Sequence, residues 1–185
     1  MTRSEETKKR RGKKKILAIL ATGALGLSLT LVPSAAFAYS TTGCKWITPN
    51  LGVQNLVDGT NNTSLAQAIS SWSSSSDVNL NSVAANQPLA TQALNYGATG
   101  WEGQASWSCG PGFTTTALAK MNSWYTSDFP VARKKMVWLH ELGHALGLGH
   151  ATSSSSVMWT SASTAYNNGT RNPTADDIAG MNSLY

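Results

Sequence analysis

The segment from residue 140 to residue 150, His-Glu-Leu-Gly-His-Ala-Leu-Gly-Leu-Gly-His, constrains the chain more than any other. His140 and His144 are four positions apart, so in a helix both imidazoles project from one face, one turn apart. That spacing suits two nitrogen ligands of a single tetrahedral metal ion. Gly147 follows three residues after His144, where glycine accepts the positive φ of a helix end and lets the chain turn. The turn can then bring His150 back as a third nitrogen ligand.

Three protein ligands with a fourth position open are typical of a catalytic zinc site, because structural zinc sites are closed by four protein ligands. All three histidines of the chain lie in this segment, which argues against histidines that merely share a helix. Glu141 follows the first histidine and can reach a water at the open position without competing for the metal. We therefore predict one catalytic Zn²⁺ held by His140, His144 and His150, with Glu141 as the general base.

The first 38 residues are typical of a secretory signal peptide that is removed after Ala38. They hold eight of the 14 Lys and Arg residues, an apolar run from Ile16 to Val32, and the ending Ala36-Phe37-Ala38. The alternative is a membrane anchor, but a run of 17 residues with Gly, Ser and Thr among them is short for a bilayer. We expect secretion to the extracellular space and no stable membrane association after cleavage.

The part expected to remain is 147 residues long, Tyr39 to Tyr185, which fits one domain with its own core. It keeps six basic and seven acidic residues, so its net charge of about −1 gives no basis for nucleic-acid binding. Cys44 and Cys109 are the only cysteines, and an even count in an oxidising compartment predicts one disulfide. We expect residues 39–185 to form a single monomeric domain.

Hydrophobic periodicity predicts the elements around the zinc segment. A helix should begin near Thr63 or Ser64, and the helix that carries the histidines should be capped by Ser127 or Asp128. The basic side chains of residues 133–135 should form a solvated face of that helix. Strands are expected at 53–57, in two short pieces between 77 and 96, at 104–107 and at 113–121, and helices at 63–74, about 130–147 and about 174–184.

The pattern from His140 to His150 is the metzincin signature, and the sequence resembles the metzincin zinc metallopeptidases, in particular their small secreted, bacterial-type, matrixin-like members. Met158 follows the third histidine closely, as does the methionine of the metzincin Met-turn, which would here span about residues 157–159. The alternative is an ordinary core methionine, since methionine fills gaps well.

The last residues also resemble the matrixins, whose C-terminal helix carries Asp-Asp-Ile and Leu-Tyr, here at 176–178 and 184–185. In that family one aspartate receives the new N-terminal ammonium and the other braces the Met-turn. The resemblance thus implies the first role for Asp176 and the second for Asp177. The alternative is a surface helix whose acidic start is favoured by the helix dipole.

The resemblance implies an α+β fold of the metzincin-like zincin type. Such a fold has a twisted, mostly parallel sheet with an antiparallel edge strand, packed on a long active-site helix, and a small C-terminal subdomain that ends in a helix. A metzincin substrate lies antiparallel to the edge strand as one more strand. Matrixins also use a propeptide cysteine to hold their zinc inactive, a second role open to Cys44, although no Pro-Arg-Cys-Gly context surrounds it. The sequence shows no calcium-binding loop, so a calcium site is without support.

The function implied is that of a secreted zinc-dependent endopeptidase that hydrolyses peptide bonds in protein or peptide substrates. Two alternatives stay open. One is a zinc amidase that acts on cell-wall peptides, and the other is a non-catalytic, zinc-containing binding module. Glu141 argues against the binding module, because a site that only binds has no need of a base at this position.

Overall fold

The computed structural model describes residues 38–185, so the predicted signal peptide lies outside the described residues except for Ala38, after which cleavage is expected. Within the described part, no helix combines the length and the apolar character needed to cross a bilayer. In chain order the elements are β1 (Asn50–Leu56), α1 (Gly59–Ser75), β2 (Asn79–Val83), β3 (Leu89–Leu94), β4 (Gly103–Cys109), β5 (Thr114–Asn122), α2 (Ser123–Thr126), α3 (Val131–Ala145), α4 (Ala162–Asn167) and α5 (Ala175–Leu184).

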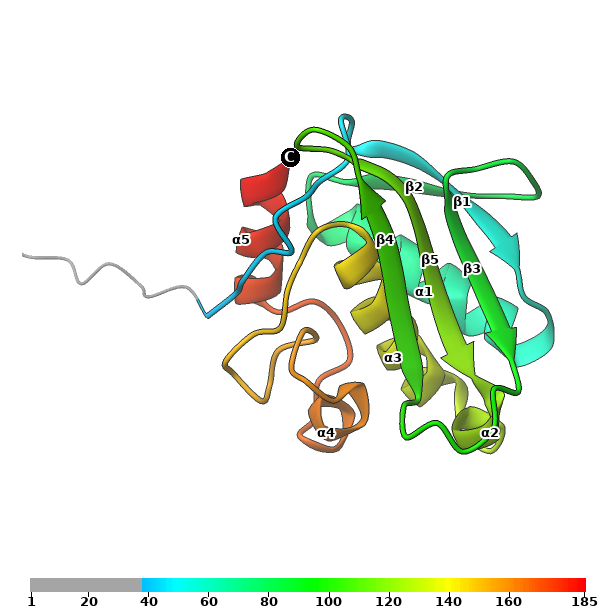
Figure 1. Ribbon diagram of the computed structural model, residues 1–185. Coiled ribbons are helices and arrows are strands. Elements are labelled where there is room, and N and C mark those ends of the chain that lie inside the picture. Colours follow the sequence, from blue (N-terminus) through cyan, green and yellow to red (C-terminus); the bar gives the residue numbers. More distant parts are fainter. Residues whose placement is uncertain (1–37) are drawn as a thin grey trace, which may run out of the picture. The chain divides into compact units, whose positions relative to one another are not determined.

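The five strands form one sheet in the order β2-β1-β3-β5-β4. β1 pairs in parallel with both β2 and β3, and β3 pairs in parallel with β5. β4 pairs only with β5 and runs antiparallel to it, which leaves β4 as an edge strand (Figure 1). The α+β fold with a mostly parallel sheet and an antiparallel edge strand, expected from the resemblance, is confirmed.

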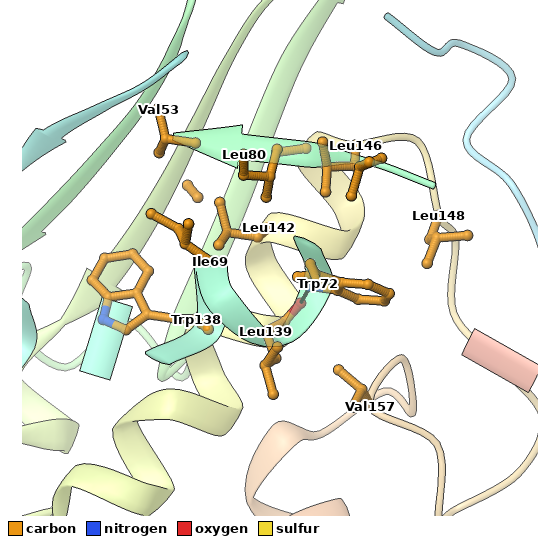
Figure 2. Packing of buried hydrophobic residues seen from close by; sticks show 14 of the residues in the cluster. Val53, Ile69, Trp72, Leu80, Trp138, Leu139, Leu142, Leu146, Leu148 and Val157 are labelled. Carbon is orange, nitrogen blue, oxygen red and sulfur yellow. Dashed lines mark hydrogen bonds between the residues drawn. The ribbon is translucent and has the colours of Figure 1, made fainter. Parts of the chain in front are cut away.

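Helices α1 and α3 pack on each other and on the same face of the sheet (Figure 1). The core lies between these helices and the sheet, as Figure 2 shows for Ile69 and Trp72 from α1 and for Trp138 and Leu142 from α3. The indole N–H of Trp72 donates to the carbonyl of Leu139 at 3.0 Å. The helix that carries the metal-site residues is thus held by packing along its length, as its apolar stripe predicts.

Two helix starts differ from the sequence-based expectation. Helix α1 begins a turn earlier, with Asp58 as its N-cap, so Ser64 is an interior residue and is fully buried. Residues 123–126 form the separate helix α2, and Pro130 in an extended conformation is the N-cap of α3. Proline disfavours a helical conformation in the residue before it, so α3 cannot begin at Ser127 or Asp128.

The C-terminal carbonyls of α3, which have no partner within the helix, receive hydrogen bonds from both ends of the domain. The Trp46 indole N–H donates to the Ala145 carbonyl at 2.8 Å, and the Tyr185 hydroxyl donates to the Leu146 carbonyl at 2.7 Å. The Thr42 backbone N–H donates to the Gly147 carbonyl at 2.8 Å. The turn after the helix is therefore fixed by segments that are distant in sequence.

A disulfide joins Cys44 to Cys109, as the cysteine count predicts, with 6.3 Å between the Cα atoms. It ties the N-terminal segment to the end of β4. Neither cysteine is free, so the alternative role of Cys44 as an inhibitory zinc-binding thiol is not supported.

The disulfide should contribute substantially to stability. It spans 65 residues of chain, and a loop of that size lowers the entropy of the unfolded chain enough for about 4 kcal/mol of stabilisation. The variant Cys44→Ala with Cys109→Ala should lose a comparable free energy of unfolding in urea denaturation. A reducing agent should destabilise the parent protein and leave the variant unchanged; equal stability of the two proteins would contradict the prediction.

Candidate metal centre

The three histidines converge on one point. His140 and His144 lie on α3, and His150 lies on the loop that follows it. One ring nitrogen from each of the three lies within 4.8 Å of the others, a grouping able to hold a metal ion. His140 is buried and His150 is exposed, so the ring nitrogens lie at the boundary between the core and solvent.

The turn that returns His150 requires glycine at residue 147. Gly147 has φ +113°, which favours glycine. A Cβ atom there would also lie 2.5 Å from the carbonyl oxygen of Cys44. The Gly149 N–H donates to the Ser40 carbonyl at 2.8 Å, and the Ser40 hydroxyl donates to the His150 carbonyl at 2.7 Å. The N-terminal segment therefore fixes the loop that carries the third histidine.

Two of the rings are oriented by backbone carbonyls. Nδ1 of His140 lies 2.8 Å from the carbonyl oxygen of Val157, and Nδ1 of His144 lies 2.8 Å from that of Leu148. Each Nδ1 must carry the proton in such a hydrogen bond, so each Nε2 has a free lone pair, the arrangement in which histidine binds metals.

The two Nε2 atoms of His140 and His144 are 3.0 Å apart. Two lone pairs at this distance repel each other unless a cation lies between them. Tetrahedral coordination at about 2.0–2.1 Å places two ligand nitrogens roughly 3.3 Å apart. The donor set and its spacing therefore fit zinc.

Burial changes the acid–base behaviour of these rings. Desolvation, with the charge of neighbouring His144, lowers the pKa of His140 to about 3. Desolvation also lowers the pKa of His144 to about 4. Both rings are therefore neutral near pH 7, as metal binding requires.

Glu141 lies next to the histidines and against the edge strand. It is 5% exposed, and desolvation raises its pKa to about 8, although a backbone hydrogen bond with Ala105 and the charge of Lys120 act in the opposite direction. A Cβ atom on Gly103 would lie 2.5 Å from Oε1 of Glu141 and 2.7 Å from Cγ1 of Val137. The absence of a side chain at Gly103 thus makes room for the carboxyl group between α3 and β4.

The predicted Met-turn lies below this site. Met158 is fully buried, and its sulfur lies so close to the backbone of Gly143 that a Cβ atom at this residue would clash with it. Asp177 is also fully buried, and its carboxylate accepts hydrogen bonds from the backbone N–H of Val157 at 3.0 Å and of Met158 at 3.2 Å, and from the Ser156 hydroxyl. The carboxylate therefore fixes the backbone of this turn.

The same carboxylate also belongs to helix α5. It accepts hydrogen bonds from the backbone N–H and the hydroxyl of Thr174, at 2.8 Å and 2.7 Å, and completes a capping box. Asp176 points elsewhere: its Oδ1 accepts a hydrogen bond from the backbone N–H of Ala38 at 2.7 Å. The two neighbouring aspartates thus contact the Met-turn and the start of the described chain, respectively.

A cleft of about 610 Å³ runs between β4 and the metal-site residues. Its walls come from β4 and the loop before it, from α3, and from the segment after the Met-turn. The residues that line it are Thr42, Gly100, Trp101, Glu102, Gly103, Gln104, Ala105, Trp107, Val137, His140, Glu141, His144, Gly149, His150, Thr160, Ser161 and Ala162.

The basic residues at the start of α3 are not merely a solvated face, contrary to the sequence-based expectation. Nη2 of Arg133 lies 3.3 Å from Oε1 of Glu102, and Nε of Arg133 donates to the Ser163 hydroxyl at 2.9 Å. Lys134 is 5% exposed, and its Nζ donates to the Thr60 hydroxyl at 2.9 Å. These side chains join α3 to α1, to α4 and to the loop before β4.

The residues that the edge strand contributes to the cleft could not be identified from the sequence. Gly103, Ala105 and Trp107 all line the cleft, and they are two residues apart, so they belong to one face of the strand. Period-two spacing was their only signal in the sequence, and it does not reveal which strand lies beside the histidines.

Asp177 should matter far more for stability than its neighbour. Asp177→Asn replaces two acceptor oxygens by one and leaves buried backbone N–H groups without partners. It should therefore lower the free energy of unfolding by about 3 kcal/mol in urea denaturation. Asp176→Asn is the matched control and should cost about 1 kcal/mol or less, since its carboxylate accepts fewer hydrogen bonds. Equal losses in the two variants would contradict this role of Asp177.

The metal-free protein should be most stable near pH 6.5. Between about pH 4.5 and 6.5 the unfolded chain protonates His140 and His144 while the folded protein does not, so acidification destabilises it. Between about pH 4.5 and 8 the folded protein keeps a proton on Glu141 that the unfolded chain loses, so stability falls as the pH rises.

Below pH 6.5 the effect of the two histidines on the free energy of unfolding is larger than that of the one glutamate, so stability rises with pH. Above pH 6.5 only the glutamate contributes, so stability falls. Thermal unfolding in the presence of a chelator should show this maximum, and Glu141→Gln should remove the decline on the alkaline side. A melting temperature of the parent protein that rises steadily up to pH 8 would contradict the raised pKa of Glu141.

The comparisons with known proteins bear on the second part of the chain. The family model for matrixin matches residues 113–185, a range that contains β5, α3, the three histidines, the Met-turn and α5. No curated protein gives a significant match to the sequence. The matrixin match and the three histidines, which could hold a metal ion, are together consistent with a matrixin-like metzincin, and this similarity implies zinc metallopeptidase activity.

Proposed function

We propose that this protein is a secreted zinc-dependent endopeptidase that cleaves peptide bonds in protein or peptide substrates. The observation that carries the proposal is the convergence of three histidine nitrogens beside a buried carboxyl group, in a cleft bordered by an unpaired strand edge. A site that only binds zinc would need the histidines alone.

His140, His144 and His150 would hold the zinc ion. When bound, zinc would lower the pKa of a water molecule and polarise the carbonyl of the bond to be cleaved. Glu141 would accept the proton of the attacking water and then deliver it to the departing amine. In the metal-free protein, burial raises the pKa of Glu141 to about 8, which favours retention of the proton by this carboxyl group between the two transfers.

The substrate would lie along the free edge of β4. An extended peptide can pair with unpaired backbone groups of an edge strand, and antiparallel pairing is slightly more stable per residue than parallel pairing. β4 is the edge strand that borders the cleft, because Gly103, Ala105 and Trp107 line it. The other edge strand, β2, contributes no residue to the cleft.

The supporting residues would hold this geometry. Gly147 would permit the turn to His150, Met158 would form an apolar floor under the histidines, and Asp177 would brace the Met-turn. Asp176 would hold the new N-terminus at Tyr39, a role supported by the hydrogen bond that its Oδ1 accepts from Ala38, the residue just before the expected cleavage.

Export from the cell is part of the proposal. It is supported by the signal-like character of the first 38 residues and by the disulfide between Cys44 and Cys109, since disulfides persist in oxidising compartments. The exported domain, residues 39–185, would act as a monomer.

Glu141→Gln tests the role of the base. This variant should lose hydrolysis of a casein-like protein by about 10²–10⁴-fold, because general-base catalysis contributes on this scale. Its zinc content, measured by metal analysis, should stay near one ion per chain, whereas His144→Ala should lose the zinc. Unchanged activity in Glu141→Gln would refute the mechanism, and activity of the parent on peptidoglycan fragments but not on protein would favour the amidase.

A further inference from the structure

Trp107 lies in an unusual place for a large apolar side chain. It is on β4, it is 37% exposed, and it lines the cleft together with the three histidines. Its ring stacks on that of His144, with 6.3 Å between the centroids and 24° between the planes. One face of the indole is therefore turned to a metal-site histidine, and the residue is partly exposed where it lines the cleft.

Strand β4 and helix α3 form the two sides of the cleft, and their contacts follow each other in order. Gly103, at the start of β4, lies against Val137 and Glu141. Ala105 contacts Glu141 through its backbone, and Trp107 stacks on His144, one helical turn further along. Trp107 thus lies beyond the general base, toward the Cys109 end of the strand.

This position determines which part of a substrate Trp107 can contact. A peptide that pairs antiparallel with β4 has its N-terminal side toward Cys109 and its C-terminal side toward Gly103. Opposed residues in an antiparallel pair place their side chains on the same face, about 4.5–5.5 Å apart at Cβ. The neighbour of Trp107 is therefore a substrate side chain on the N-terminal side of the bond that is cleaved.

The surroundings of Trp107 favour an apolar side chain there. The carboxylates among the cleft-lining residues are those of Glu102 and Glu141. Glu102 is paired with Arg133, and Glu141 is buried beside Ala105. A charged substrate side chain beside the indole would thus find no unpaired carboxylate among the residues that line the cleft. An aromatic substrate side chain would instead gain from apolar burial and from stacking on the indole.

We propose that Trp107 determines specificity, and that its indole binds an aromatic or large aliphatic side chain on the N-terminal side of the cleaved bond. This inference rests on the proposed peptidase function and adds a substrate class to it. Trp107 also lies outside residues 113–185, the range matched by the matrixin model.

The test uses a peptide that the exported protein cleaves and that has alanine at every position on the N-terminal side of the cleaved bond. It is compared with versions of this alanine parent that carry phenylalanine at one of these positions. The exported protein should cleave one of the phenylalanine versions roughly tenfold faster in kcat/KM than the alanine parent, since burying a ring is worth at least about one factor of ten. Trp107→Ala should lose this preference, so that its kcat/KM values for the phenylalanine version and the alanine parent become nearly equal. Trp124→Ala, which removes an exposed tryptophan away from the cleft, should keep it.

Peptide binding provides a measurement that needs no turnover. Calorimetry on Glu141→Gln should show the same preference for the phenylalanine peptide, and Trp107→Ala in that background should abolish it. If Trp107→Ala slows both peptides equally, the indole only positions His144 and the inference is wrong. The absence of any phenylalanine preference would overturn it as well. Preferential binding without cleavage by the zinc-loaded parent would instead count against the peptidase function and leave the specificity of Trp107 intact.

Discussion

The structure depends above all on bringing three imidazoles to one point, which is unfavourable unless a cation is bound there. Nε2 of His140 and Nε2 of His144 lie 3.0 Å apart, and backbone carbonyls hold the opposite nitrogens of both rings. The protein therefore fixes the ligand geometry through its own hydrogen bonds. Binding of the ion would relieve the repulsion between lone pairs, so folding and metal binding should favour each other.

Much of the domain serves to hold the end of α3 and the turn that follows it. Trp46 and Tyr185 satisfy the last carbonyls of the helix, and Ser40 fixes the backbone of His150. Asp177, from the C-terminal helix, fixes the turn below the histidines. The two ends of the domain thus meet at the metal centre, and the disulfide ties one of them to the strand that forms the opposite wall of the cleft. Such external support suits a site whose catalysis would suffer from small displacements of its ligands.

The parts of the site that could be predicted from the sequence are those set by local spacing. The interval between His140 and His144, the glycine at 147 and the disulfide each follow from a short-range rule or a simple count. The contacts of Arg133 and Lys134 could not be predicted, because a basic residue on a helix is usually solvated and only the packing of α1 and α4 shows otherwise. Gly103 and Trp107 were missed because period-two spacing indicates a strand, while its place beside α3 is set by the order of the whole sheet.

X-ray absorption spectroscopy of the zinc-loaded protein would show whether three imidazoles bind one ion. We expect one zinc ion with three imidazole nitrogens at about 2.0–2.1 Å and one further light-atom ligand that is not from the protein. Replacing His150 by alanine should remove one imidazole from this set. A closed shell of four protein ligands, a sulfur ligand, or only two imidazoles would contradict the arrangement on which the proposed chemistry depends.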